Sequence, residues 1–289
     1  MILRTKHKIF IASIAFRFVR ILRNVQGKGM QGQFQRAGFN WQLDLREVVD
    51  FMIYISGGFE AYLSRFIRNN VKGGDVVMDI GANIGAHTLA MGKSVGASGR
   101  VYAIEATEYA YSKLQTNIAL NPELSSQVEA IHCILAASDN VADSFEIHSS
   151  WPFESKAERH SSHQGVTKSV GAAPAISLDT LVASHGITRL DFIKMDVDGH
   201  EWDVLSGGRQ TFERMRPVIV MEIAPDYHDP EHAKGFFNIH RFLSELGYTF
   251  HDFNGAVLPQ QAKALAATIP DGASKNVVLL PQGARLPQF

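Results

Sequence analysis

A group of acidic side chains follows an apolar run in residues 193–205, IKMDVDGHEWDVL. Asp196 ends the run, and Asp198, Glu201 and Asp203 come soon after it. Carboxylates so close together repel one another, so water, a helix end, a cation or a ligand must compensate their charge. Which of these partners is present decides what chemistry the segment can perform.

Acidic residues also stand at or just after the ends of the other apolar runs. In an open α/β sheet, ligands bind beyond the carboxyl ends of the strands, where such residues would gather. The repeated pattern therefore predicts one ligand site along one edge of a sheet. The residues that make up this pattern are Asp79, Glu105, Ser138 with Asp139, Asp196 and Glu222.

The turn after the first run, GANIG at residues 81–85, has the form of a cofactor-binding loop. Gly81 and Gly85 let the backbone turn tightly and let a ligand approach closely. Glu105 stands about 20 residues beyond the loop, where an acid can accept both ribose hydroxyls of a nucleoside. Asn83 replaces the middle glycine of the dinucleotide-binding pattern, which favours a nucleoside ligand without a pyrophosphate. The alternative is a plain strand-to-helix turn with Glu105 as a surface acid.

Apolar runs and helical stretches alternate along the chain, and these elements must position the acids. Strands are predicted at residues 75–80, 100–105, 128–137, 191–196, 217–223, 248–253 and 276–280. Helices are predicted at residues 85–96, 109–121 and 236–247. Continuously apolar strands that alternate with helices form a parallel sheet covered on both faces. We therefore expect an α/β fold, Rossmann-like and doubly wound, with a mostly parallel seven-stranded sheet and helices on both faces.

Composition excludes several classes of protein. The 289 residues are 45% hydrophobic and can bury a full core, and a net charge of −1 does not favour nucleic acid as a partner. Cys133 is the single cysteine, so neither an intrachain disulfide nor a cysteine zinc cluster can form. Its apolar surroundings predict a buried thiol.

The polar stretch at residues 140–177 interrupts the alternation of strands and helices, which indicates an insertion with a hairpin or a loop.

Residues 1–30 form a separate basic segment ahead of a domain at residues 31–289. The segment contains seven lysine and arginine residues and no acid. Read as a helix, it gathers Ile11, Ile14, Phe18 and Ile21 on one face, which could lie on an anionic membrane surface. In the alternatives, this apolar face packs on the domain, or the segment is a targeting signal. We expect a cytoplasmic protein that can contact the inner face of the membrane through this segment.

Residues 76–106, VVMDIGANIGAHTLAMGKSVGASGRVYAIEA, resemble the first motif of class I S-adenosylmethionine-dependent methyltransferases, and more narrowly that of FkbM-type methyltransferases. Three further stretches resemble the same family in the same order. They are WQLDLREVVDFMIYISGGFE at 41–60, ISLDTL with LDFIKMDVDGHEWDVLSGG within 176–208, and PVIVMEI at 217–223. The likeness covers roughly residues 41–253, and Ala106 departs from it where the family often has proline. The resemblance implies a class I methyltransferase that uses S-adenosylmethionine.

The resemblance also implies a role for each strand-end residue. Asp79, Gly81, Asn83 and Gly85 would surround the methionine part of the cofactor, and Glu105 would hold the ribose. Ser138 and Asp139 would lie near the adenine. Asp196 would face the methionine end and the transferred methyl group. The acceptor would be a hydroxyl on a small molecule, a sugar or a glycan.

The segment at 193–205 then contains residues that could begin a helix and residues that could take part in catalysis. Asp198 and Glu201 have the spacing of a capping box, in which Asp198 begins a helix and Glu201 stands three residues later. Methyl transfer to oxygen also needs a base, and His200 is our leading candidate, with Asp196 beside it, because imidazole titrates near neutral pH. A competing arrangement uses a divalent cation on Asp196, Asp198 or Glu222. We assign no metal site from the sequence.

Two other functions remain open at this stage. A nicotinamide-dependent oxidoreductase could use the same sheet edge, although Asn83 and the lack of a Tyr-x-x-x-Lys pattern disfavour it. A cofactor-binding scaffold at a membrane would need no catalytic residues. The sequence leaves the oligomeric state and the identity of the acceptor open.

Overall fold

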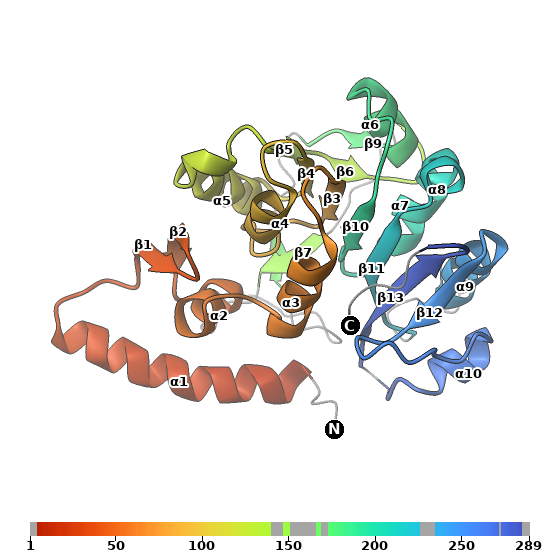
Figure 1. Cartoon of the computed structure of the whole chain (residues 1–289). Helices are drawn as coiled ribbons and strands as arrows, with labels where there is room; N and C mark the ends of the chain where they lie inside the picture. The colour runs from red at the N-terminus through yellow and green to blue at the C-terminus, as the bar shows by residue number, and fades with distance from the viewer. Residues whose placement is uncertain are drawn as a thin grey trace.

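The computed structural model describes residues 5–139, 147–150, 166–168, 173–225, 235–271 and 273–284. Its centre is a seven-stranded sheet with the order β12-β13-β11-β10-β3-β4-β5 (Figure 1). Neighbouring strands are parallel except that β13 runs antiparallel to both β11 and β12. The strands are β3 (Val76–Ile80), β4 (Arg100–Glu105), β5 (Val128–His132), β10 (Phe192–Met195), β11 (Val218–Ile223), β12 (Tyr248–His251) and β13 (Lys275–Pro281). The predicted fold class and all seven predicted strands are confirmed.

The third predicted strand is shorter than expected. It leaves the sheet after His132, and Ile134–Leu135 forms a separate short strand, β6, that pairs with β9 (Ala175–Ile176). Cys133 and both residues of β6 are buried. The run at 128–137 hid this break because it continues without a turn signal from the partly exposed edge strand β5 into the buried strand β6.

Helices cover both faces of the sheet (Figure 1). One face carries α2 (Val48–Ser56), α3 (Ala61–Asn70), α4 (Thr88–Val95) and α5 (Glu108–Ala119), and a short helix η1 (Pro122–Leu124) follows α5. The other face carries α6 (Leu178–Ser184), α7 (Glu201–Gly207), α8 (Arg209–Met215), α9 (Phe236–Glu245) and α10 (Ala262–Ala266). Alternate strand residues enter the two cores, as Val77 does on one side and Met78 on the other. Burial on both faces explains why the strands are continuously apolar.

A hairpin of β1 (Gln31–Arg36) and β2 (Phe39–Asp44) packs against α5. Asn117 of α5 accepts a hydrogen bond from the Gln42 amide at 2.7 Å and donates one to the Ile84 carbonyl at 2.8 Å. Asn121 exchanges two hydrogen bonds with the backbone of Asn40. Two buried asparagines therefore join the hairpin to the helix, and Asn117 also holds the glycine turn.

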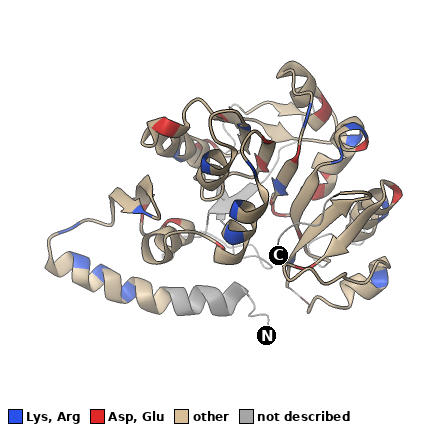
Figure 2. Cartoon of the chain, viewed as in Figure 1, with Lys and Arg blue, Asp and Glu red and all other residues tan. Residues whose placement is uncertain are grey.

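The helix α1 (Thr5–Val25) differs from one of the sequence-based expectations. It packs on α2 through Phe16, which is only 2% exposed, whereas Ile14, Phe18 and Ile21 are exposed. The alternative in which this apolar face packs on the domain is therefore wrong. Figure 2 shows basic and no acidic residues along the described part of α1. Among the residues that the structure describes, no helix has the length and apolar character needed to cross a membrane.

The insertion at 140–177 is described only in part. Two short strands, β7 (Ile147–Ser150) and β8 (Val166–Lys168), pair in antiparallel fashion, as a hairpin requires. Residues 140–146, 151–165 and 169–172 lie outside the described part of the chain.

Replacing Asn117 by alanine should destabilise the protein by about 1–3 kcal/mol, because it leaves the partly buried amide of Gln42 and the buried carbonyl of Ile84 without this partner. Urea unfolding measures this change. Gln115→Ala, on the exposed side of the same helix, should change the free energy of unfolding by less than about 0.5 kcal/mol. Equal stability in the two variants would contradict the role of Asn117.

Candidate functional site

A cavity of about 520 Å³ opens at the carboxyl ends of β3, β4, β10 and β11. Its volume lies in the range of small-molecule sites, about 300–1,000 Å³. Val48 and Met52 of α2, with Phe59 in the loop that follows it, supply one wall, and the residues around Cys133 supply another. The polar lining residues include Glu60, Asn83, His87, Glu105, Lys194, Asp196, Asp198, His200 and Glu222. The structure therefore brings together most of the strand-end residues that the sequence singled out.

Gly81 lines the cavity at the turn that follows β3. Its φ is +76°, and a Cβ atom there would lie 1.9 Å from the carbonyl oxygen of Asp196. No side chain fits between these two backbones, so glycine lets the ends of β3 and β10 approach. Gly85, in contrast, is not a lining residue, and its Cβ would meet Leu114 of α5 at 2.9 Å. It lets the turn after β3 pack closely against α5.

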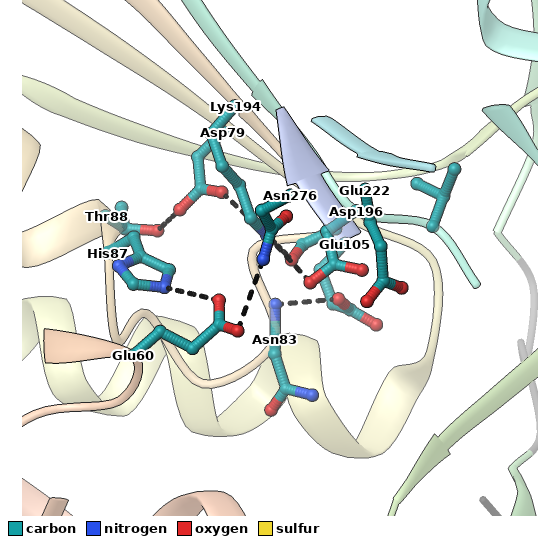
Figure 3. Close-up of polar contacts among 12 residues, drawn as sticks. Glu60, Asp79, Asn83, His87, Thr88, Glu105, Lys194, Asp196, Glu222 and Asn276 are labelled. Atoms are coloured by element: carbon teal, nitrogen blue, oxygen red, sulfur yellow. Dashed lines mark hydrogen bonds and ion pairs between the residues drawn. The ribbon is translucent and has the colours of Figure 1, made fainter. Parts of the chain in front are cut away.

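Glu105 is buried at the end of β4 and has three protein donors. One carboxylate oxygen accepts hydrogen bonds from the amide and the hydroxyl of Thr107, at 2.9 and 2.7 Å. The other accepts one from the Asn83 amide at 2.9 Å (Figure 3). A carboxylate offers about four acceptor positions, so about one remains for a ligand. Burial raises the pKa of Glu105, and the three donors oppose that shift.

Lys194, a residue that the sequence analysis did not assign, stands behind the glycine turn. Its ammonium donates to the Gly81 carbonyl at 2.8 Å and lies 3.3 Å from Asp79 and 3.9 Å from Asp196 (Figure 3). Burial would lower the pKa of Lys194, but the two aspartates raise it above its ordinary value. A lysine inside the apolar run FIKMD was the signal that could have revealed this residue.

Three carboxylates form a cluster at the ends of β10 and β11. Oxygen atoms of Asp196, Asp198 and Glu222 all lie within 4.8 Å of one another, which is close enough for one cation. Burial raises the pKa of Glu222 to about 8, with repulsion by Asp196 as the next cause. Burial, followed by repulsion from Asp196 and Glu222, raises the pKa of Asp198 well above its ordinary value. The cluster can therefore hold protons, a metal ion or another cation.

The predicted capping box is wrong. Helix α7 begins after His200, and no side chain caps it. Glu201 accepts long hydrogen bonds from the amides of Val197 and Gly199, at 3.4 and 3.3 Å. Its carboxylate therefore bonds within the turn that precedes α7. Asp198 adopts a left-handed backbone with φ +51° and lines the cavity. The spacing predicted that the helix begins directly after Asp198, but it begins two residues later, after His200. Asp198 therefore lies in the turn before the helix and lines the cavity instead.

His200 lines the cavity at the start of α7. Its Nδ1 lies 3.3 Å from a carboxylate oxygen of Asp203, one turn further along the helix. A proton on Nδ1 that is shared with Asp203 leaves Nε2 as the basic nitrogen. The pair has the arrangement of a histidine base that a carboxylate orients.

Glu60 and His87 form a second acid–histidine pair that the sequence analysis did not single out. The two side chains approach to 4.0 Å (Figure 3). His87 Nδ1 also lies 3.5 Å from the Ser64 hydroxyl. Burial, followed by the charge of Lys194, lowers the pKa of His87 to about 4. A histidine that binds protons so weakly is a poorer base at neutral pH than an imidazole of ordinary pKa.

Several predicted cofactor residues do not reach the cavity. Asp79 is fully buried behind the glycine turn and accepts a hydrogen bond from Thr88 at 2.6 Å. Ser138 and Asp139 lie outside the lining of this cavity, and their expected place beside the adenine stays a prediction. Asp139 accepts hydrogen bonds from the Ser177 amide and the Thr180 hydroxyl, both at 2.7 Å. It therefore ties the end of β6 to the start of α6.

Residues 79–250 match the Methyltransferase FkbM domain family. This match covers more than half of the chain, and the chain belongs to the FkbM methyltransferase family. The resemblance seen in the motifs of the sequence is thereby confirmed.

Two curated methyltransferases are similar in sequence. The hexuronic acid methyltransferase AglP of Haloferax volcanii is 26% identical over 156 residues, which are 54% of this chain and 59% of that protein. The chain thus covers less than two thirds of AglP. The methyltransferase sdnD of Sordaria araneosa is 25% identical over 227 residues, which are 70% of this chain and 84% of that protein. Among solved structures, the FkbM methyltransferase of Methylobacillus flagellatus is 18% identical with a TM-score of 0.43, covering 72% of this chain and 43% of that one.

The raised pKa of Glu222 predicts that stability falls as pH rises. Between its ordinary value of 4.5 and about 8, Glu222 holds a proton only in the folded chain. The free energy of unfolding should therefore decrease with pH across this window, by up to ~1.4 kcal/mol per unit. Urea unfolding in EDTA at several pH values measures the slope. Glu222→Gln should reduce it, whereas Glu213→Gln, at an exposed surface acid, should preserve it. A slope that Glu222→Gln leaves unchanged would exclude Glu222 as its source.

Proposed function

We propose that this chain transfers the methyl group of S-adenosylmethionine to a hydroxyl oxygen of an uncharged small molecule, sugar or glycan. One observation carries the proposal. A single cavity contains both Asn83 with Glu105, where a nucleoside can bind, and Asp196 with His200, where an acceptor can lose a proton. Direct transfer needs donor and acceptor aligned in one continuous space.

The chemistry of the lining fits S-adenosylmethionine. Glu105 keeps about one acceptor position for a ribose hydroxyl beside the Asn83 amide. At the other end, Asp196, Asp198 and Glu222 concentrate acidic groups, and Lys194 is the nearby cation among the described lining residues. An excess of carboxylates stabilises a positive charge, and the sulfonium of the cofactor carries one.

Each residue then has a defined task. When bound, S-adenosylmethionine supplies a methyl group on a sulfonium, and transfer replaces the methyl–sulfur bond by a methyl–oxygen bond. His200 takes the proton of the acceptor hydroxyl at Nε2. Asp203 orients the ring through Nδ1 and stabilises the imidazolium that forms. The products are a methyl ether, S-adenosylhomocysteine and a protonated His200, so atoms and charge balance.

The charge of the cavity supports an uncharged acceptor. AglP is named for a hexuronic acid, which carries a carboxylate of its own. In this chain the acceptor end presents Glu60, Asp196, Asp198 and Glu222, and an acidic sugar there would add negative charge beside Asp198 and Glu222, whose pKa values burial and their acidic neighbours already raise. Neutral hydroxyls, in contrast, can donate hydrogen bonds to these carboxylates. We therefore place the acceptor among neutral polyhydroxylated molecules.

Binding of S-adenosylhomocysteine should raise the melting temperature of the wild type, whereas NAD should not, because only a ligand that binds the native state stabilises it. Glu105→Gln replaces an acceptor oxygen by a donor and should lose roughly 1–3 kcal/mol of this stabilisation. Glu108→Gln, at an exposed acid on α5, should keep the full shift. Differential scanning fluorimetry makes the comparison. Equal shifts in the two variants would mean that the ribose does not bind at Glu105.

His200→Ala should keep the affinity for S-adenosylhomocysteine and lose turnover by roughly 10²–10⁴. Turnover is followed by mass spectrometry of cell extracts that are incubated with protein and methyl-labelled cofactor. His185→Ala, at a partly exposed histidine outside the cavity lining, should retain full activity. Activity should also survive EDTA. Loss of activity in EDTA that Mg²⁺ or Mn²⁺ restores would transfer the role of His200 to a cation on Asp196, Asp198 and Glu222.

A further inference from the structure

The helix α1 exposes a continuous apolar face. Its residues recur at the spacing of one side of a helix over about three turns. They are Ile14, Phe18, Ile21, Leu22 and Val25, with exposed fractions of 58%, 63%, 61%, 44% and 82%. We call these five residues the apolar stripe. Large apolar side chains that are contiguous and this exposed indicate a surface that another body covers.

The opposite side of α1 is anchored to the domain, so the apolar stripe points outward. Phe16 packs edge-on against Phe51 of α2, with ring centroids 5.8 Å apart. The Arg23 guanidinium donates to the Gly29 carbonyl at 2.6 and 2.8 Å and lies over the ring of Phe34. The helix cannot turn its apolar stripe inward without breaking these contacts.

The charge around the apolar stripe has one sign. Residues 1–43 contain eight lysine and arginine residues, and the first acid of the chain is Asp44. Arg17 is exposed on the helix and flanks the apolar stripe. Figure 2 shows that acidic residues lie on the rest of the molecule instead. A partner that covers the apolar stripe therefore meets a positive surface and should be negatively charged.

We propose that α1 lies in the plane of an anionic phospholipid membrane, with the apolar stripe among the acyl chains and the basic residues at the lipid headgroups. This combination of an apolar face and positive charge is the one that interfacial helices use. A second copy of the chain fits less well, because it would bring two all-basic segments together. The inference does not depend on the proposed methyl transfer.

Membrane contact through α1 would place the cavity beside the lipid surface. Phe16 of α1 contacts Phe51 of α2, and α2 also carries Val48, Val49 and Met52, which line the cavity. One helix thus separates the membrane contact from the candidate site.

Sedimentation of the full chain with lipid vesicles tests the proposal. The wild type should bind vesicles of phosphatidylcholine with phosphatidylglycerol and bind phosphatidylcholine alone much less. Raising the salt from about 0.1 to about 1 M should weaken binding, because the screening length falls from about 10 to about 3 Å. The triple substitution Phe18→Ser, Ile21→Ser and Val25→Ser should lower binding at least ~10-fold.

A matched control separates the apolar stripe from general surface hydrophobicity. The triple substitution Phe237→Ser, Ile55→Ser and Val257→Ser removes the same residue types at similarly exposed positions elsewhere and should leave binding unchanged. Circular dichroism should show the same thermal unfolding for both triple variants, because all six side chains are exposed. Absence of wild-type binding, or equal binding by both triple variants, would overturn the proposal. A concentration-dependent dimer without vesicle binding, lost in the first variant by ultracentrifugation, would identify a second copy as the partner instead.

Discussion

The site depends on one buried ion pair between neighbouring strands. Lys194 of β10 is register-paired with Asp79 of β3, and its ammonium lies between that carboxylate and the Gly81 carbonyl. Without its partner, either charge would be costly to bury. The pair thus requires β3 and β10 to be adjacent and in this register. Because Lys194 also reaches the backbone of the glycine turn and approaches Asp196, one cation aligns the two strand ends that form the floor of the cavity.

The second constraint is the surplus of negative charge in the cavity. Asp196, Asp198 and Glu222 approach within 4.8 Å of one another, and Lys194 lies close enough to pair with only the first of them. Burial, followed by repulsion from Asp196, raises the pKa values of Asp198 and Glu222. A site that binds a sulfonium, a metal ion or donating hydroxyls relieves the same repulsion. The electrostatics of the cavity and the proposed chemistry therefore have one physical origin.

Sequence reasoning succeeded where a residue's role follows from its place in an element. Glu105 stands at the end of a buried strand and Gly81 in the turn after one, so their positions at the sheet edge could be predicted. It failed where a role depends on the direction of a side chain. Asp198 has the spacing of a helix cap but lines the cavity, and Asp139 stands at a strand end but bonds to Ser177 and Thr180 of a distant segment.

The sequence by itself determined the α/β class, the seven strands, the strand-end acids and the FkbM family, because apolar periodicity and motifs are properties of contiguous residues. Tertiary structure alone decided that Lys194 joins Asp79, that Glu60 meets His87, and that α1 turns its apolar stripe outward. These facts depend on which side chains from distant elements meet. Neither spacing nor composition encodes that, because burial and charge pairing arise only when the sheet has brought the elements together.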